Sequence, residues 1–187
     1  MGFSRIYWGF LFFFDLRIQG IDILPDFIGY GLIYLGLKEL VSMNSHFVEA
    51  QKYTVVLGIL SIFDLYQIQI PMGEFHLNSI SGIFMLTGII IGLLDLLMVF
   101  HLCQGIAELA AGKGFIELKN LTLSRWRYYL YLRVGMAAIA PVALLMPLLA
   151  IWAFIPLFIM SIIVLVLMMG LMRKAVCLTE QPPLWVP

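Results

Sequence analysis

The stretch Asp15-Leu-Arg-Ile-Gln-Gly-Ile-Asp-Ile-Leu-Pro-Asp26 places three acidic residues and one arginine between two strongly apolar runs. The run before it, residues 6–14, and the run after it, residues 27–37, contain no charged side chain. Apolar runs on either side of a Pro-containing polar stretch predict two short helices joined by a turn, which we place at residues 22–26. Gly29, Gly31 and Gly36 are expected to let a neighbouring helix approach the second helix closely.

The composition of the whole chain indicates that lipid is its solvent. Of the 187 residues, 63% are hydrophobic and only 12% are charged, and the mean hydropathy is +1.02. Ordinary soluble domains are about half apolar and about a quarter charged. The composition therefore excludes an ordinary soluble domain, and the formal net charge of zero gives no indication of a nucleic-acid partner.

Apolar segments recur along the chain, separated by polar connections at residues 41–52, 71–78 and 104–124. For residues 41–52 we expect a connecting loop or a surface-lying turn of helix. Residues 134–172 contain no charged residue and no histidine, and one helix of that length would be about twice as long as the bilayer core is thick. We therefore expect a turn at Ala150–Pro156, with Trp152 at the interface and Pro156 opening the next helix. The prediction is an all-α, polytopic transmembrane bundle, a single integral membrane domain over residues 1–187. Six spans form three hairpins, at about residues 5–19, 25–40, 53–70, 79–103, 126–149 and 156–172.

The basic residues predict the orientation of this bundle. If the N-terminus is cytoplasmic, every Lys and Arg except Arg17 falls on or near the cytoplasmic side. The opposite orientation contradicts the positive-inside rule almost everywhere. We therefore expect a multi-pass protein of the cell membrane with both termini in the cytoplasm.

Four charged residues stand out inside the predicted spans, Asp15, Arg17, Asp64 and Asp95, because charge there is costly and usually faces protein or water. Asp64 and Asp95 are expected at similar depths on neighbouring antiparallel helices. One interpretation is a carboxylate pair that binds a cation or shares a proton, since two close carboxylates in a low dielectric raise one pKa strongly. The other interpretation is structural, with each carboxyl protonated or paired separately and with Arg133 as the counter-ion of Asp95. The complete candidate intramembrane site is Asp15, Arg17, Asp64, Asp95 and Arg133.

The outer turns carry a second group of candidate residues. Asp22, Pro25 and Asp26 suit the start of a helix, because Asp caps free amides, Pro fits the first turn and an acid favours the positive end of the helix dipole. A second interpretation adds Glu74 and His76 from the next outer turn. Together with Asp22 and Asp26 they form an acidic outer mouth for a cation or a basic partner.

Aromatic residues alternate with arginines near the start of the fifth span. This pattern is typical of an aromatic belt with snorkelling arginines. The same cluster is a candidate binding surface for anionic lipid head groups. The arginines concerned are Arg125, Arg127 and Arg133.

Catalytic and metal-binding patterns are missing from the sequence. His46, His76 and His101 fall on three separate connections or span ends and lack metal-ligand spacing, so no metal site is expected. The chain contains no HExxH, GxSxG, Walker or CxxC motif. We expect a non-enzyme without a cofactor.

The N-terminal hairpin also carries a resemblance, in the segment Tyr7-Trp-Gly-Phe-Leu-Phe-Phe-Phe-Asp-Leu-Arg-Ile-Gln-Gly-Ile-Asp-Ile-Leu-Pro-Asp-Phe-Ile-Gly-Tyr30. This segment resembles uncharacterised small multi-pass membrane proteins of Gram-positive bacteria, a family that implies no activity. In length and number of spans the chain is also similar to the substrate-capturing membrane subunits of energy-coupling vitamin transporters. The expected function is a small-solute or ion transporter, or a membrane subunit of a transport system. The alternative is a non-catalytic partner of another membrane protein, such as an assembly, immunity or sensing subunit.

Overall fold

The computed structural model describes the backbone of residues 2–13, 17–18, 21–22, 26–64, 79–145 and 147–180. Side chains are described for residues 2–13, 26–62, 87–139, 152–153 and 155–180. Asp15, Glu74 and His76 lie outside the described residues. The side chains of Arg17, Asp22 and Asp64 lie outside them as well, although the backbone of these three residues is described.

The described chain is helical apart from one two-residue ladder, which confirms the all-α class. The ladder pairs β1 (Arg17–Ile18) with β2 (Ile21–Asp22) in antiparallel register. The helices are α1 (Gly2–Leu11), α2 (Asp26–Leu40), α3 (Ser45–Asp64), α4 (Ser79–Gly112), α5 (Ile116–Leu145), α6 (Pro147–Ala175) and the short α7 (Cys177–Glu180).

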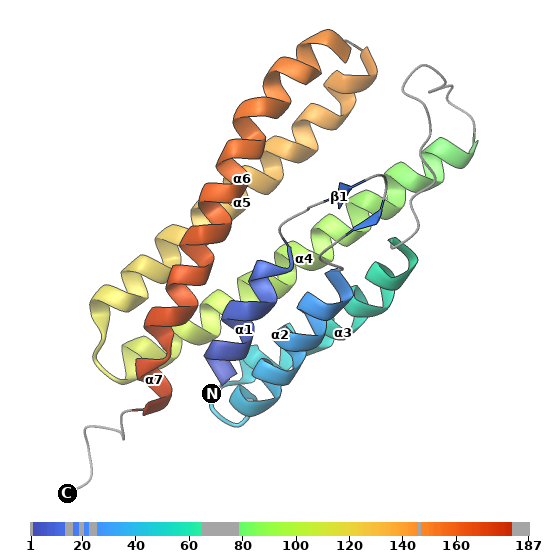
Figure 1. Ribbon diagram of the computed structural model, residues 1–187. Coiled ribbons are helices and arrows are strands. Elements are labelled where there is room, and N and C mark those ends of the chain that lie inside the picture. The colour runs from blue at the N-terminus through green and yellow to red at the C-terminus, as the bar shows by residue number, and fades with distance from the viewer. Residues whose placement is uncertain are drawn as a thin grey trace, which may run out of the picture.

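The six long helices form a closed circuit. Each of them packs against the next in the sequence, and α6 returns to pack against α1. Figure 1 shows α5 and α6 as a long hairpin beside the blue and green helices α1 to α4. The N-terminus, the α2–α3 connection, the α4–α5 turn and α7 all lie toward the same end of the molecule.

Glycines bring α1 and α2 into backbone contact. A Cβ atom at Gly36 would lie 2.5 Å from the carbonyl oxygen of Gly2, and one at Gly9 would lie 2.8 Å from that of Gly29. Such distances leave no room for a side chain, so only glycine fits. The expected close approach at Gly29 and Gly36 is confirmed, whereas a Cβ at Gly31 would meet no atom within 4 Å.

The first hairpin turns earlier than predicted. The helix α1 ends at Leu11, and Arg17 lies in the ladder rather than in a helix extending to residue 19. The chain reverses between Ile18 and Ile21, ahead of the expected turn at residues 22–26, and Asp26 is the first residue of α2. At a rise of 1.5 Å per residue, α1 is about 15 Å long and α2 about 22 Å, both shorter than the roughly 30 Å of hydrocarbon in a bilayer.

Two predicted polar connections are largely helical. The helix α3 begins at Ser45, α4 continues to Gly112, and α5 begins at Ile116. Only a short turn remains between α4 and α5, where Gly114 has a φ of 79°. The physical reason is that Ala, Leu, Glu and Lys, which are frequent in residues 104–124, are strong helix formers whether or not lipid surrounds them.

The predicted turn at Ala150–Pro156 is wrong. Pro156 lies inside α6, and Pro147 is the proline that opens this helix. Both prolines follow apolar residues, so the sequence contains no polar signal that distinguishes them. Trp152, expected at the interface of a turn, is an exposed residue on α6.

Two stretches are long and apolar enough to cross a membrane, Thr87–Gly112 in α4 and Ile155–Glu180 in α6 and α7. Within an apolar window of 18 residues, only 39% of the first and 22% of the second is buried inside the protein, whereas the core helix of a soluble protein is mostly buried. Among the described residues no other helix meets the same criteria. Two candidate spans are thus identified, and the arrangement of six spans stays a prediction.

Candidate functional site

Asp95, Tyr129 and Arg133 form a polar cluster between α4 and α5. Asp95 is only 1% exposed, although it lies in the middle of an apolar helix. Tyr129 and Arg133 are four residues apart on α5, a spacing that brings two side chains to the same face of a helix. The predicted pairing of Asp95 with Arg133 is confirmed by an ion pair between Arg133 Nη2 and Asp95 Oδ2.

The hydroxyl of Tyr129 connects the two charged groups. It donates a hydrogen bond to Asp95 Oδ2 and accepts hydrogen bonds from Arg133 Nη2 at 2.9 Å and Nε at 3.1 Å. The guanidinium carbon of Arg133 also lies 5.3 Å from the centre of the Tyr129 ring, within the range of a cation–π interaction. The arrangement fixes the guanidinium and the carboxylate in one orientation.

One oxygen of the cluster lacks a partner. Asp95 Oδ1 is buried and accepts no hydrogen bond from any described residue. A buried acceptor without a donor costs about 1–3 kcal/mol. A cation, a proton or a donor group from a bound molecule would remove that cost.

The cluster lies in the wall of a cavity of about 370 Å³ at the centre of the helix circuit. Five of the six long helices contribute to its lining, all except α3. The polar lining consists of the cluster together with Asp26, Tyr30 and Ser161, and the remainder is apolar or aromatic, including Phe10, Phe13 and Phe158. A small site with an aromatic lining and a few convergent polar groups is typical of a ligand-binding site.

Asp26, the first residue of α2, lines the same cavity. The sequence placed this residue in an outer mouth or in a helix-initiating role, and as the first residue of α2 it fulfils the second expectation. Tyr30, one helical turn further along, is buried, and its ring packs 4.7 Å from that of Phe13. The approach of Asp26 and Tyr30 to Asp95 was not predicted, because these residues are more than sixty positions apart.

Asp64 and Asp95 do not share a level along their helices. Tyr53 on α3 stacks on His101 on α4, with ring centroids 5.7 Å apart, which fixes the register of the antiparallel pair. Asp64 lies eleven residues beyond Tyr53, while Asp95 lies only six residues before His101. The expectation of similar depths is therefore wrong, by about five residues or about 7 Å of helix rise.

Two histidines that the sequence placed on separate connections are in contact. His46 Nδ1 lies 3.1 Å from His101 Nδ1, and His46 Nε2 lies 3.2 Å from Glu108 Oε1. Asn44 donates a hydrogen bond of 2.7 Å to the other oxygen of Glu108. This second polar cluster joins the start of α3 to α4, and a separation of fifty-five residues gave no sequence signal for it.

The three arginines expected at a lipid surface have different environments. Arg133 belongs to the cluster with Asp95, and Arg125 Nη1 donates a hydrogen bond to the carbonyl oxygen of Leu167 on α6. Arg127 is exposed. Two of the three guanidinium groups are thus engaged within the protein.

Comparisons with known proteins add no further assignment. No protein-family model matches the chain, and neither the curated proteins nor the solved structures contain a match.

Proposed function

We propose that this chain is a multi-pass integral membrane protein whose central cavity binds a small solute or ion, as a transporter or as the membrane subunit of a transport system. The observation that carries the proposal is the placement of a buried carboxylate with a free oxygen, Asp95, in the wall of that cavity. Intramembrane charges of this kind commonly mark a substrate or ion path.

Membrane placement is supported by the outward faces of the long helices. On α4 and α6 these faces carry large apolar side chains that are about half exposed, among them Ile89, Ile90, Leu93, Ile159 and Val166. Exposed apolar surface on this scale needs an apolar environment or a partner. Most lysines and arginines lie toward the end that holds the N-terminus, α7 and the α4–α5 turn, which favours cytoplasmic termini.

The lining of the cavity indicates the chemistry of the solute. The carboxylate of Asp95 offers an acceptor, Arg133 carries a fixed positive charge, and the remaining wall is aliphatic with three phenylalanine rings. A molecule with one ionised or hydrogen-bonding group and a compact apolar body fits such a site, and the cavity of about 370 Å³ limits its size. The aromatic rings also suit a cation.

The experiment compares the purified wild-type protein with the double variant Asp95→Leu/Arg133→Met, which removes both charges from the cavity. Alkali cations, aliphatic amines, amino acids and small carboxylates are screened for an increase in melting temperature, and each hit is then tested for uptake into proteoliposomes. The proposal expects a solute that stabilises the wild type and is transported, but does not stabilise the double variant.

The matched control is Glu49→Gln/Lys52→Gln, which removes an exposed ion pair on α3 outside the cavity. It is expected to retain the response to any solute that the wild type binds. The proposal fails if no solute in the screen stabilises the wild type, or if the double variant responds as the wild type does.

One observation favours the alternative of a non-catalytic membrane partner. Gly88 and Gly92 lie four residues apart on α4, and a Cβ atom at either would meet no described atom within 4 Å. Exposed Ile89 and Leu93 lie beside them. A small-xxx-small pattern on an open helix face is a common contact surface between membrane helices.

The alternative is tested by Gly88→Leu/Gly92→Leu, with Gly31→Leu as the control because Gly31 also faces open space, on α2. If the face binds a second membrane protein or a second copy, chemical cross-linking in membranes is expected to decrease in the double variant and to stay unchanged in the control. Equal cross-linking in all three proteins would contradict a partner on this face.

A further inference from the structure

We propose that the pocket between the start of α5 and the end of α6 binds an anionic phospholipid, with the head group at Lys174 and an acyl chain along the apolar floor. Nothing in the central cavity enters this argument. The proposal shares with the proposed function only the membrane location of the chain.

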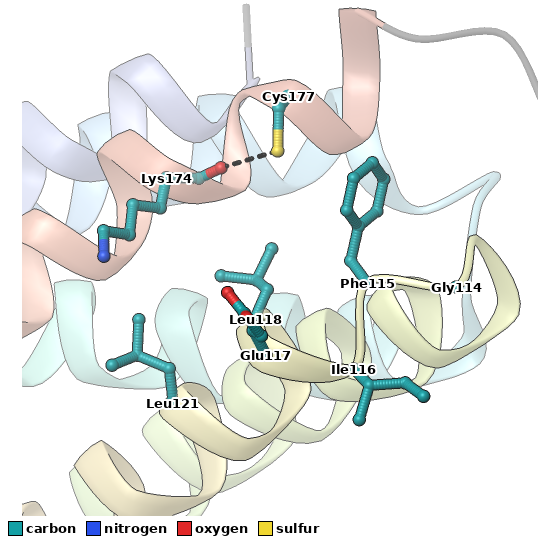
Figure 2. A pocket seen from close by; sticks show the side chains of 8 residues that line it. All are labelled: Gly114, Phe115, Ile116, Glu117, Leu118, Leu121, Lys174 and Cys177. Atoms are coloured by element: carbon teal, nitrogen blue, oxygen red, sulfur yellow. Dashed lines mark hydrogen bonds between the residues drawn. The ribbon is translucent and has the colours of Figure 1, made fainter.

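The pocket has a volume of about 630 Å³ and an amphipathic lining. Figure 2 shows the side chains of Leu118 and Leu121 projecting into it from α5, with Phe115 at one side and the Lys174 side chain at the other. Leu118 is buried, so the floor of the pocket is part of the folded core. The remaining lining residues are Gly114, Ile116, Glu117 and Cys177.

Charge complementarity favours an anionic head group. The two segments that form the pocket, residues 113–119 and 173–180, contain four basic and two acidic residues and therefore carry a net charge of +2. Lys174 and its neighbour Arg173 are exposed, and neither forms an ion pair with any described residue. The nearest acid in the lining, Glu117, is a single carboxylate on the opposite wall.

The location of the pocket favours a lipid over a soluble anion. It lies at the end of the molecule that holds the N-terminus and α7, and the long apolar helices α5 and α6 extend away from it (Figure 1). A phospholipid in the adjoining leaflet would have its head group level with the ends of these helices and its chains beside them. Basic residues at this level attract anionic lipids, each with about 1 kcal/mol.

Cys177 provides a native reporter of occupancy. Its thiol lines the pocket and donates a hydrogen bond of 2.9 Å to the carbonyl oxygen of Lys174. The other cysteine, Cys103, is only 1% exposed. A maleimide reagent is therefore expected to modify Cys177 alone while the protein is folded, and a lipid in the pocket should slow that reaction.

The experiment measures the rate of Cys177 alkylation by mass spectrometry in nanodiscs of phosphatidylcholine, with and without phosphatidylglycerol. The proposal expects slower alkylation when phosphatidylglycerol is present. In Lys174→Gln, the phosphatidylglycerol content needed for half-maximal protection should rise about fivefold, the equivalent of the interaction of one lysine with an anionic surface. The control Lys38→Gln removes an exposed cation on α2, outside the pocket, and should behave as the wild type does.

A second variant, Leu121→Trp, fills the apolar part of the pocket and should reduce protection by phosphatidylglycerol while leaving Lys174 in place. Soluble glycerol phosphate, added to the phosphatidylcholine sample, should give no protection because it has no acyl chain. Equal rates in the two lipid compositions, or protection by glycerol phosphate, would overturn the proposal. Since no transport is measured, this outcome is independent of the test of the central cavity.

Discussion

The α1–α2 interface and the α4–α5 interface bring helices together by opposite means. At the first, the backbones touch, because Gly2 lies opposite Gly36 and Gly9 lies opposite Gly29. At the second, a buried carboxylate meets a guanidinium and a phenol, and a cavity remains beside them. At the glycines the first contact is fixed by shape, and an exposed ion pair between Arg5 and Glu39 also joins the two helices. The second contact is fixed by hydrogen bonds and charge within the buried cluster.

The two interfaces also differ in whether they can bind a solute in addition to stabilising the fold. Where Gly2 and Gly9 contact α2, no space and no side-chain polar group remain, so this glycine contact is a structural element. At the α4–α5 interface, Asp95 Oδ1 is buried without a donor among the described residues, and a cavity lies beside the cluster. Buried unsatisfied acceptors are rare in folded proteins, and a functional role is one explanation for this one. We therefore expect substitutions in the first interface to change stability only and substitutions in the second to change stability and binding separately.

The largest expected effect is that of Arg133→Met. Removing the cation leaves the carboxylate of Asp95 buried without its counter-ion, which typically costs about 3–5 kcal/mol. The double variant Asp95→Leu/Arg133→Met should recover most of this loss, because neither charge then remains. The free energy of unfolding in mixed micelles measures both, and a double variant as unstable as the single one would contradict the assignment of an ion pair.

A smaller effect is expected for Gly36→Ala. The added methyl group would lie 2.5 Å from the carbonyl oxygen of Gly2 and 2.6 Å from Ile6 Cγ1, so α1 must move away from α2. Overpacking of this kind costs about 1–3 kcal/mol. Thermal unfolding measures the loss, and binding by the protein that remains folded should be unchanged. A wild-type melting temperature would show that the two helices are not in backbone contact.

The smallest effect, and of opposite sign, is expected for Gly31→Ala. This glycine lies on the same helix as Gly36, but a Cβ atom there meets no atom within 4 Å. Alanine is the better helix former by about 1 kcal/mol, so the variant should gain up to that amount. The same unfolding measurement tests it, and a destabilisation comparable with that of Gly36→Ala would mean that Gly31 contacts a surface as well.

The sequence predicted features that depend on a single residue type in an unusual environment, such as a charged residue within an apolar segment. An aspartate and an arginine in apolar segments require partners, which made the pairing of Asp95 with Arg133 predictable. The break at Pro147 was missed because an apolar run with three prolines contains no signal that distinguishes a helix start from a proline within a helix. The contribution of Tyr129 was missed because a tyrosine near a span end is typical of an aromatic belt, and only the pairing of helices shows where its hydroxyl points.

Sequence patterns did not predict which distant segments pack against each other. Gly2 and Gly9 gave no signal by themselves, since their function depends on the register of α1 against Gly29 and Gly36. The contact of His46 with His101 likewise depends on the register of α3 against α4. Residues 104–124 are predicted as a polar connection because they include four charged residues, whereas the structure is helical to Gly112 and again from Ile116.

The return of α6 to α1 has a consequence for biosynthesis. Of the six long helices, α1 is synthesised first and α6 last, yet the two pack against each other and both contribute to the wall of the cavity. Contacts between segments so distant in the chain form late, because their loop-closure entropy is lost before they contribute any stability. A nascent chain that lacks α6 therefore has an incomplete cavity. Asp95 likewise has no counter-ion until α5, which carries Arg133, has been synthesised. We therefore expect the chain to be most susceptible to proteolysis before α5 and α6 have been synthesised.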